Sequence, residues 1–374
     1  MILISKGGYL MLGAISPGKT IWGIPLYSVF IVSAIMLAIY LCSKEEKRLG
    51  FPKDTVIDMA LWLIPVGIVG ARLYYVAFEW DQFADKLISI FYVWQGGIAI
   101  YGALIGGLIA AYFFARVRRL SLPLLADMIF PTVALAQSIG RWGNYFNMEA
   151  YGEVISNPSF QFFPFGVLIP EASGYVWHLA TFFYESVWDF GVFSLLWFNR
   201  KKEHKPGDLS LWYILLYGPG RAFIEGLRMD SLYTGGGLRV SQWISLIACF
   251  LASSYFLVRS FKNSKDAFPS FWAWCSYLPS VLGLIALFLS AHASIPLWAR
   301  LLPSFVSLIL LWTISHKNTD KTLKTVIVSL FPLLQLITLV FERHLDPLLF
   351  TTLQTALAGL LFPAVSYLLY PHTL

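Results

Sequence analysis

The chain has 374 residues, of which 57% are hydrophobic and only 13% are charged, and its formal net charge is +6. Such a composition leaves too little polar surface for a soluble globular protein and predicts an integral membrane protein. The basic residues are dispersed along the chain instead of forming one stripe, which argues against a nucleic-acid partner and is compatible with contacts to anionic lipid.

Long apolar runs follow one another from residue 21 onward and are separated by short polar loops. A run of about 17 to 25 apolar residues is long enough to cross the ~30 Å hydrocarbon core of a bilayer as a helix. We therefore expect an all-α fold, a polytopic integral membrane helix bundle with about eleven transmembrane helices. The runs are 21–42, 56–78, 97–115, 122–139, 181–198, 209–227, 240–258, 271–290, 297–315, 326–341 and 348–370.

Positive charge alternates between the loops. Because short cytoplasmic loops carry an excess of lysine and arginine, the loops after the first, third, fifth, seventh and ninth runs are expected to be cytoplasmic. The amino terminus is then outside and the carboxyl terminus is cytoplasmic, and the first run is expected to act as the targeting signal. The basic residues of these loops are Lys44, Lys47, Arg48, Lys53, Arg116, Arg118, Arg119, Arg200, Lys201, Lys202, Lys205, Arg259, Lys262, Lys265, Lys317, Lys321 and Lys324.

Cysteine and histidine show no metal-ligand spacing. The three cysteines, Cys42, Cys249 and Cys275, lie in or at the ends of apolar runs and are expected to be small core residues. The histidines form no HExxH-type pattern and no Gly-rich loop ends in Gly-Lys-Ser/Thr, so we expect neither a metal enzyme nor a P-loop protein. Close packing between transmembrane helices accounts for Gly96, Gly97, Gly102, Gly106 and Gly107.

The outer end of the fourth run contains a concentration of polar residues. Arg141, Asn144, Asn147 and Glu149 all lie within residues 137–152, beside apolar chain. At the edge of a bilayer, groups of this kind cost several kcal/mol unless they are paired. We therefore interpret the segment as a substrate site.

The sixth run carries a second polar set on one helical face. Tyr217, Arg221, Glu225 and Arg228 recur at intervals of four, four and three residues, and ~3.6 residues per turn places them on one side of a helix. Two guanidinium groups beside one carboxylate suit a phosphate; the alternative is an intramembrane salt-bridge network that fixes helix packing. Residues 218–220, Gly-Pro-Gly, predict a kink that opens backbone groups toward a cavity.

Residues 140–152 read Gly-Arg-Trp-Gly-Asn-Tyr-Phe-Asn-Met-Glu-Ala-Tyr-Gly. This segment resembles the signature Gly-Arg-x-Gly-Asn-Phe-x-Asn-x-Glu-x-x-Gly of the bacterial prolipoprotein diacylglyceryl transferases, with Tyr145 at the phenylalanine position. The stretch from Tyr217 to Arg228 resembles a second diagnostic stretch of the family, and shorter resemblances in the same chain order extend the match over roughly residues 20 to 260. They are Tyr27, Gly70-Ala71-Arg72, Trp94-Gln95-Gly96-Gly97, Thr181 with Phe183, Tyr184 and Glu185, and Ser241 with Gln242, Trp243 and Ser245.

Taken singly, several of these residues have ordinary structural interpretations. Tyr27 and Trp94 fit an interfacial aromatic belt, and Arg72 fits a charge that snorkels to the membrane surface. Glu185 fits a helix cap, where a carboxylate complements the helix dipole, and we interpret it as structural.

The resemblance implies a seven-span core over residues 1–265, with an external loop at about 151–180, in the inner (cell) membrane of a bacterium. It implies transfer of the sn-1,2-diacylglyceryl group from phosphatidylglycerol to the lipobox cysteine thiol of preprolipoproteins, which forms a thioether and releases glycerol 1-phosphate. The implied partners are phosphatidylglycerol, preprolipoprotein signal peptides and membrane lipid, with no cofactor and no metal. A membrane lipid transporter and a catalytically silent lipid-binding scaffold are the alternatives.

The resemblance also assigns candidate site residues. Guanidinium groups offer paired donors to phosphate oxygens, so Arg141 and Arg221 are expected to hold the headgroup, and their replacement by alanine to abolish transfer without unfolding the protein. Tyr101 stands where many family members carry histidine; it is either the base or a residue that orients substrate while positive charge favours the thiolate. The catalytic candidates are Arg141, Arg221, Tyr101 and Glu149, and the substrate-binding candidates are Tyr27, Arg72, Asn144, Asn147, Gly152, Tyr217, Glu225 and Arg228.

Three features lack a single interpretation. His178, in the external loop, either touches substrate or has a surface role. The aromatic-rich loop itself either gates substrate entry or only covers the ends of the spans. Beyond residue 265 the resemblance ends, and residues 266–374 are expected to form a four-span membrane extension of unknown function.

Overall fold

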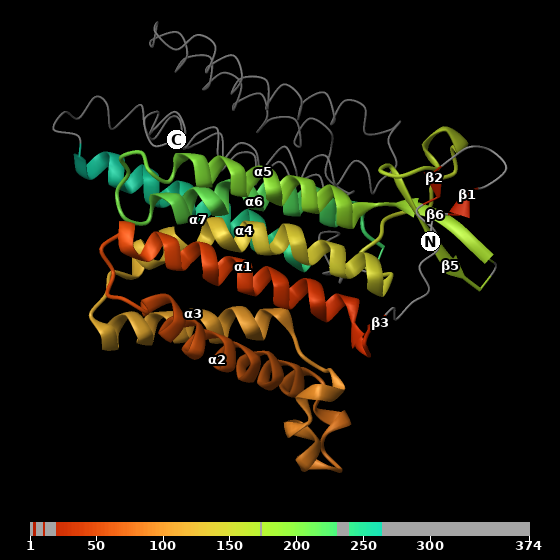
Figure 1. Cartoon of the computed structure of the whole chain (residues 1–374), viewed down its shortest axis with the longest axis horizontal. Helices are drawn as coiled ribbons and strands as arrows, with labels where there is room; N and C mark the ends of the chain where they lie inside the picture. Colours follow the sequence, from red (N-terminus) through yellow and green to blue (C-terminus); the bar gives the residue numbers. More distant parts are fainter. Residues whose placement is uncertain (1–2, 5–9, 12–19, 173, 230–238, 264–374) are drawn as a thin grey trace, which may run out of the picture. The chain divides into compact units, whose positions relative to one another are not determined.

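The computed structural model describes residues 3–4, 10–11, 20–172, 174–229 and 239–263. Within them lie seven long α-helices, which follow the first seven predicted apolar runs to within several residues (Figure 1). The last four predicted runs lie outside the described residues. The helices are α1 (Leu26–Arg48), α2 (Thr55–Phe78), α3 (Ile100–Arg118), α4 (Leu122–Asn147), α5 (Thr181–Asn199), α6 (Asp208–Leu227) and α7 (Val240–Asn263).

Four of these helices, α1 to α4, are long and apolar enough to cross a membrane. Helix α7 has a shorter apolar stretch, Val240–Phe256. Helices α5 and α6 are not among these four, and they contain charged residues, such as Glu185 and Asp189 in α5 and Arg221 in α6. The described part of the chain is therefore mostly helical and membrane-spanning, whereas the total of eleven spans stays a prediction.

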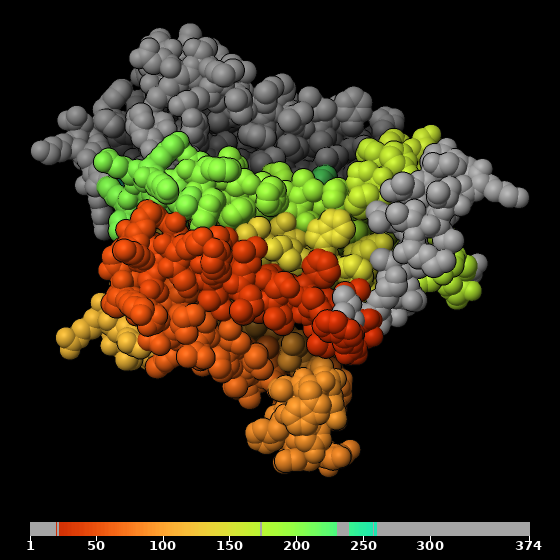
Figure 2. Space-filling view, viewed as in Figure 1, coloured from red at the N-terminus to blue at the C-terminus, as the bar shows by residue number. Residues whose placement is uncertain are grey.

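Large apolar side chains cover the outside of the helices. In α1, for example, Val32, Met36 and Tyr40 are each more than half exposed, and α1 forms much of the surface coloured red in Figure 2. Soluble monomers rarely expose contiguous apolar surface of this kind, whereas a surface that faces lipid chains requires it.

A β-hairpin lies between α4 and α5, so the described chain is mostly helical and the expectation of an all-α fold is corrected. Strands β5 (Gly166–Glu171) and β6 (Gly174–Leu179) form an antiparallel hairpin in which Val167 pairs with His178. Val167 and Ile169 are buried by the hairpin, and this two-residue alternation is typical of a strand with one face toward a core. The remaining short elements are the pairs β1 (Leu3–Ile4) with β2 (Leu10–Met11) and β3 (Thr20–Ile21) with β4 (Ile24–Pro25), and the 3-10 turns η1 (Trp80–Gln82), η2 (Leu87–Phe91), η3 (Val93–Gln95) and η4 (Pro158–Phe160).

The chain divides into two compact units. One comprises Ile35–Thr132, and the other comprises Met1–Ala34 together with Val133–Leu374. Helices α1 and α4 each contribute residues to both units. This division differs from the predicted domains 1–265 and 266–374, whose boundary stays a prediction.

Within Ile35–Thr132, helices α2 and α3 pack closely through glycine. A Cβ atom added at Gly70 would lie less than 3.0 Å from the carbonyl oxygen of Gly102, and one added at Gly102 would meet Gly70 equally closely. Gly106 has the same relation to Val66. Since only small residues let transmembrane backbones approach in this way, the predicted packing role is confirmed for Gly102 and Gly106.

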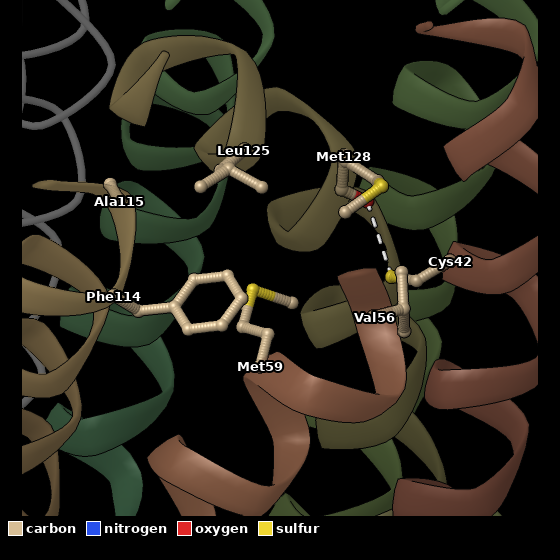
Figure 3. Close-up of a cluster of buried hydrophobic side chains, with 7 residues drawn as sticks. All are labelled: Cys42, Val56, Met59, Phe114, Ala115, Leu125 and Met128. Carbon is tan, nitrogen blue, oxygen red and sulfur yellow. Dashed lines mark hydrogen bonds between the residues drawn. The ribbon is translucent and has the colours of Figure 1, made fainter. Parts of the chain in front are cut away.

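A buried apolar cluster lies in the same unit (Figure 3). Its members come from α1, α2, α3 and α4, and the thiol of Cys42 donates to the carbonyl of Met128 at 3.5 Å. Cys42 is therefore a core residue, as expected, and Cys249 of α7 is buried as well; Cys275 lies outside the described residues. The cluster consists of Cys42, Val56, Met59, Phe114, Ala115, Leu125 and Met128.

Candidate active site

Two arginines from different helices share one buried carboxylate. Arg141 of α4 approaches Glu185 of α5 with 2.7 Å between Nη2 and Oε1. Arg221 of α6 donates from Nη1 to both carboxylate oxygens, at 2.9 and 3.0 Å. All three residues belong to the unit that contains Val133–Leu374, so the fold brings the two predicted phosphate-binding arginines together.

Glu185 is a residue whose role the sequence interpretation missed. Helix α5 begins at Thr181, so Glu185 lies beyond its first turn and does not cap the helix. Its side chain is only 1% exposed and joins Arg141 to Arg221. The available signal was its place in a short family-like stretch; the partners themselves come from helices distant in sequence.

The predicted polar face of α6 forms a chain of ion pairs. Glu225 Oε2 lies 2.6 Å from Nη2 of Arg221 and 3.5 Å from Nη1 of Arg228. Tyr217 stacks on Tyr213, with 5.4 Å between the ring centres. The salt-bridge network is therefore present and includes Arg141, Arg221 and Arg228. Its guanidinium groups also suit an anionic ligand.

The polar residues at the end of α4 converge on one carboxylate. Asn144 and Asn147 each donate from Nδ2 to Oε1 of Glu149 at 3.1 Å. Met148 and Ala150 adopt positive φ angles of 54° and 57°, which turns the chain away from the helix and brings Glu149 back toward the two amides. The three side chains thus form one hydrogen-bonded group, and their part in a substrate site stays a prediction.

Tyr27 lies against the same segment. A Cβ atom added at Gly143 would stand 3.0 Å from Cδ2 of the Tyr27 ring. In addition, Phe30 stacks on Phe146 with 5.2 Å between ring centres. Gly143, two residues after Arg141, thus leaves room for the ring of Tyr27 beside α4.

Gly152 lies where three backbone segments meet. Its N–H donates to the carbonyl of Leu179 at 2.8 Å, and it forms a β-bridge with Arg228. A Cβ atom at this position would come within 3.0 Å of Leu227, Leu179 and Thr181. Only glycine fits here, and it joins the end of the hairpin to the end of α6.

His178 does not have the surface role that was one of its two interpretations. Its side chain is fully buried in the hairpin. Nδ1 lies 2.9 Å from the carbonyl oxygen of Gly152, and Nε2 lies 2.9 Å from Oε1 of Glu171. Both ring nitrogens are thus engaged by the protein, and the imidazole fixes the position of Gly152.

Arg72 belongs to the unit Ile35–Thr132 and is not a snorkelling charge. Its guanidinium is buried and donates to the carbonyls of four residues that follow α2. The distances are 2.8 Å from Nε to Ile90, 2.7 Å from Nη2 to Ser89, and 2.7 Å from Nη1 to both Gly96 and Gly97. The arginine therefore holds the loop between α2 and α3, including part of the family-like Trp94–Gly97 stretch.

Replacing Arg72 with lysine is expected to release this loop, because an ammonium group cannot reproduce a planar fork that serves four carbonyls. Hydrogen bonds to a charged group contribute about 1.5–3 kcal/mol each. Limited proteolysis of the detergent-purified protein should then show new cleavage within residues 80–99. Arg116→Lys is the matched control, since Arg116 is exposed on α3 and donates to the hydroxyl of Tyr112 on its own helix at 3.3 Å. Equal protection of the loop in both variants would contradict the assignment.

Tyr101 lies in the first turn of α3, in the same unit as Arg72. Its ring centre is 6.4 Å from that of Tyr74 on α2. The part that Tyr101 plays in a reaction stays a prediction.

Helix α6 continues through residues 218–220, and two neighbouring helices pack against its glycines. A Cβ atom at Gly218 would lie less than 3.0 Å from Sγ of Cys249, and one at Gly220 would lie as close to the indole of Trp188. The indole N–H of Trp188 donates to the carbonyl of Leu216 at 3.0 Å. The carbonyl of Leu216, near Pro219, is thus hydrogen-bonded by a side chain of α5. The sequence had predicted that backbone groups here would open toward a cavity.

The carboxyl-terminal turn of α6 is held by a buried arginine that the sequence interpretation did not single out. Arg239, just before α7, donates from its guanidinium to the carbonyl of Glu225. Gln242 donates to the carbonyl of Ala222 at 2.9 Å and accepts from the N–H of Arg239 at 3.0 Å. A cation at a helix carboxyl terminus also complements the helix dipole.

Among the described residues, no group of three or more histidine, cysteine, aspartate or glutamate side chains is placed to hold a metal ion. The residues that converge are arginines, carboxylates, amides and tyrosines. Such a set can bind an anion and stabilise negative charge that develops on it.

The comparisons with known proteins point to one family. The family model described as prolipoprotein diacylglyceryl transferase matches residues 19–258. The phosphatidylglycerol–prolipoprotein diacylglyceryl transferase of Enterococcus faecalis is 46% identical over 245 residues, which are 64% of this chain and 88% of the relative. The enzymes of the same name from Limosilactobacillus reuteri and Pediococcus pentosaceus are each 40% identical, over 63% and 70% of this chain and 87% and 96% of their own lengths.

Proposed function

We infer that this chain, which belongs to the prolipoprotein diacylglyceryl transferase family, transfers the diacylglyceryl group of phosphatidylglycerol to a prolipoprotein. The acceptor that we propose is the lipobox cysteine thiol of a preprolipoprotein signal peptide. The observation that carries the proposal is the pair Arg141 and Arg221, which the buried Glu185 joins. All three residues lie within the range that the family model matches.

The reaction replaces a carbon–oxygen bond with a carbon–sulfur bond and releases the thiol proton to solvent. The sulfur of the thiolate forms a bond to the carbon of the diacylglyceryl group that carries the phosphate. The bond from this carbon to the phosphate oxygen breaks, and its electron pair leaves with glycerol 1-phosphate. Because negative charge grows on the phosphate as this bond breaks, donors that are already aimed at it lower the barrier.

Arg141 and Arg221 suit this task because guanidinium groups present planar, paired donors and stay charged in a site of low dielectric constant. Glu185 keeps the two groups near each other before the lipid binds, and Glu225 holds Arg221 from the other side. We propose that the phosphate takes over donors that Glu185 now engages. Arg228 supplies further positive charge.

The remaining candidates take supporting roles in our proposal. Asn144, Asn147 and Glu149 shape the headgroup site at the end of α4, and Glu149 also acts in catalysis. Gly152, Tyr217 and Tyr27 border it. Arg72 acts through the loop that it holds, and Tyr101 orients the substrate while the positive charge of the site favours the thiolate. These roles are supported by the contacts described above and by the family resemblance of the segments.

We further propose that the amino terminus lies outside and the carboxyl terminus in the cytoplasm of a bacterial cell, as the loop charges suggest. Residues 1–265 then form the catalytic core. Residues 266–374 form an additional membrane region beyond the stretch that the family model matches.

Purified protein in detergent, given radiolabelled phosphatidylglycerol and a lipobox peptide, tests the proposal. We expect label on the peptide together with release of glycerol 1-phosphate, and no label on the same peptide with serine in place of cysteine. Well-folded protein that labels neither peptide would instead favour the lipid transporter or the silent scaffold.

A further inference from the structure

Asp189 is a buried acid without a hydrogen-bond partner. It lies on α5, one helical turn after Glu185, and its side chain is fully buried. Neither carboxyl oxygen has a hydrogen-bond partner among the residues that the structure describes. Burying such a group unsatisfied costs several kcal/mol, and native proteins rarely keep one without a purpose.

The surroundings of Asp189 are polar and belong to the candidate site. It lies within electrostatic range of Arg141, Arg221 and Glu185, and of Tyr213 and Tyr217 as well. These residues are all in one compact unit.

A second polar layer thus lies one turn away from the arginines. Gln137 precedes Arg141 by four residues on α4, and its Oε1 accepts from the hydroxyl of Tyr213 on α6 at 2.8 Å. Asp189 follows Glu185 by the same interval on α5. Gln137 and Tyr213 are hydrogen-bonded to each other, whereas neither carboxyl oxygen of Asp189 has a hydrogen-bond partner in the described structure.

A ligand that fills this layer must combine a phosphate with uncharged hydrogen-bond donors. The phosphate meets Arg141 and Arg221, and one helical turn, ~5.4 Å, is comparable to the length of a three-carbon alcohol. A cationic headgroup is disfavoured because it would enter beside two guanidinium groups, whereas hydroxyl groups carry no charge. The glycerol headgroup, with two hydroxyls, has the required chemistry.

We propose that Asp189 determines headgroup specificity, an inference that rests on the proposed function. Asp189 accepts hydrogen bonds from the headgroup hydroxyls of phosphatidylglycerol while Arg141 and Arg221 hold its phosphate. The carboxyl group accepts in either protonation state. An analogue without the hydroxyls leaves the acid unpaired, so the site rejects it.

The test compares two lipids in the transfer assay with the full chain: phosphatidylglycerol, and phosphatidylpropanol, whose headgroup has the same carbons and charge but no hydroxyl. The unmodified protein should prefer phosphatidylglycerol by about 100-fold in kcat/KM, because the analogue leaves a buried polar group unpaired. Asp189→Leu should lower the rate with phosphatidylglycerol and bring this preference close to one. Leucine has a similar branched shape, and no described partner is lost, so the thermal unfolding temperature should not fall.

Glu185→Gln is the contrasting variant, since it disturbs the phosphate arginines and should lower transfer from both lipids equally. If Asp189→Leu does not fold, Asp189→Ala replaces it; alanine also lacks an acceptor and should reduce the preference at least tenfold. An unchanged preference in the folded variant, or an equal loss of rate with both lipids, overturns this inference and leaves the proposed function standing. Absence of transfer from either lipid by the unmodified protein overturns the proposed function and this inference with it.

Discussion

Arg221→Lys and Arg141→Lys should each lower diacylglyceryl transfer by about 100- to 1,000-fold, the typical cost of removing one preorganised donor from developing negative charge. Lysine keeps the positive charge but replaces a planar fork with a single point donor. In the structure Arg221 uses one nitrogen for Glu185 and another for Glu225. One ammonium group cannot hold both carboxylates and also meet a phosphate.

The ion pairs explain why replacement by lysine tests the phosphate role more cleanly than replacement by alanine. Alanine would leave Glu185 buried beside Arg141 alone and Glu225 without its closest partner, and removing one member of a buried pair costs about 3–5 kcal/mol. The sequence led us to expect that Arg221→Ala leaves the fold intact; the buried contacts argue that loss of activity in that variant would be mixed with loss of stability.

Initial rates per folded protein, with thermal unfolding measured in the same detergent, test the prediction. Arg259→Lys is the matched control, because Arg259 also pairs with an acid of α6, Asp208, at the opposite end of that helix. It should transfer at nearly the normal rate. Near-normal rates in Arg141→Lys and Arg221→Lys as well would refute the phosphate role of the two arginines.

What the sequence could predict depends on how local each feature is. The apolar runs located seven helices because run length and hydropathy are properties of one segment. The face of α6 that carries Arg221 and Glu225 followed from helical periodicity, and the grouping of Asn144, Asn147 and Glu149 followed from a short segment. In each case the interacting residues are at most five positions apart in the sequence.

The features that the sequence did not predict depend on long-range packing. Periodicity says that Glu185 and Asp189 share a side of α5, but not that this side faces Arg141 and Arg221. In the same way, the guanidinium of Arg72 is satisfied by carbonyls of a later loop, which carry no side-chain signal. The hairpin was also missed, because its aromatic residues suggested a loop on the membrane surface.

Gly220→Ala should destabilise the protein and lower transfer by about 100-fold, although alanine is normally the better helix former by about 1 kcal/mol. The reason is steric: the added methyl group would overlap the indole of Trp188, which is fixed by its bond to the carbonyl of Leu216. Relief requires that α5 and α6 move apart, and overpacking of this kind costs about 1–3 kcal/mol. Since Arg221 follows Gly220 directly and Glu185 precedes Trp188 by less than one turn, the same movement separates the arginine from its carboxylate.

The direction of the stability change in Gly220→Ala distinguishes steric packing, which predicts a loss, from helix propensity, which predicts a gain. Gly191→Ala, on α5, is the control because nothing lies within 4 Å of the added atom, so it should be neutral or slightly stabilising. Adding Trp188→Ala to Gly220→Ala removes the overlap and should restore part of the lost thermal stability and transfer. If Gly220→Ala is tolerated as well as Gly191→Ala, the contact does not position Arg221. If the double variant is as impaired as the sum of the two single variants, the two residues are not coupled.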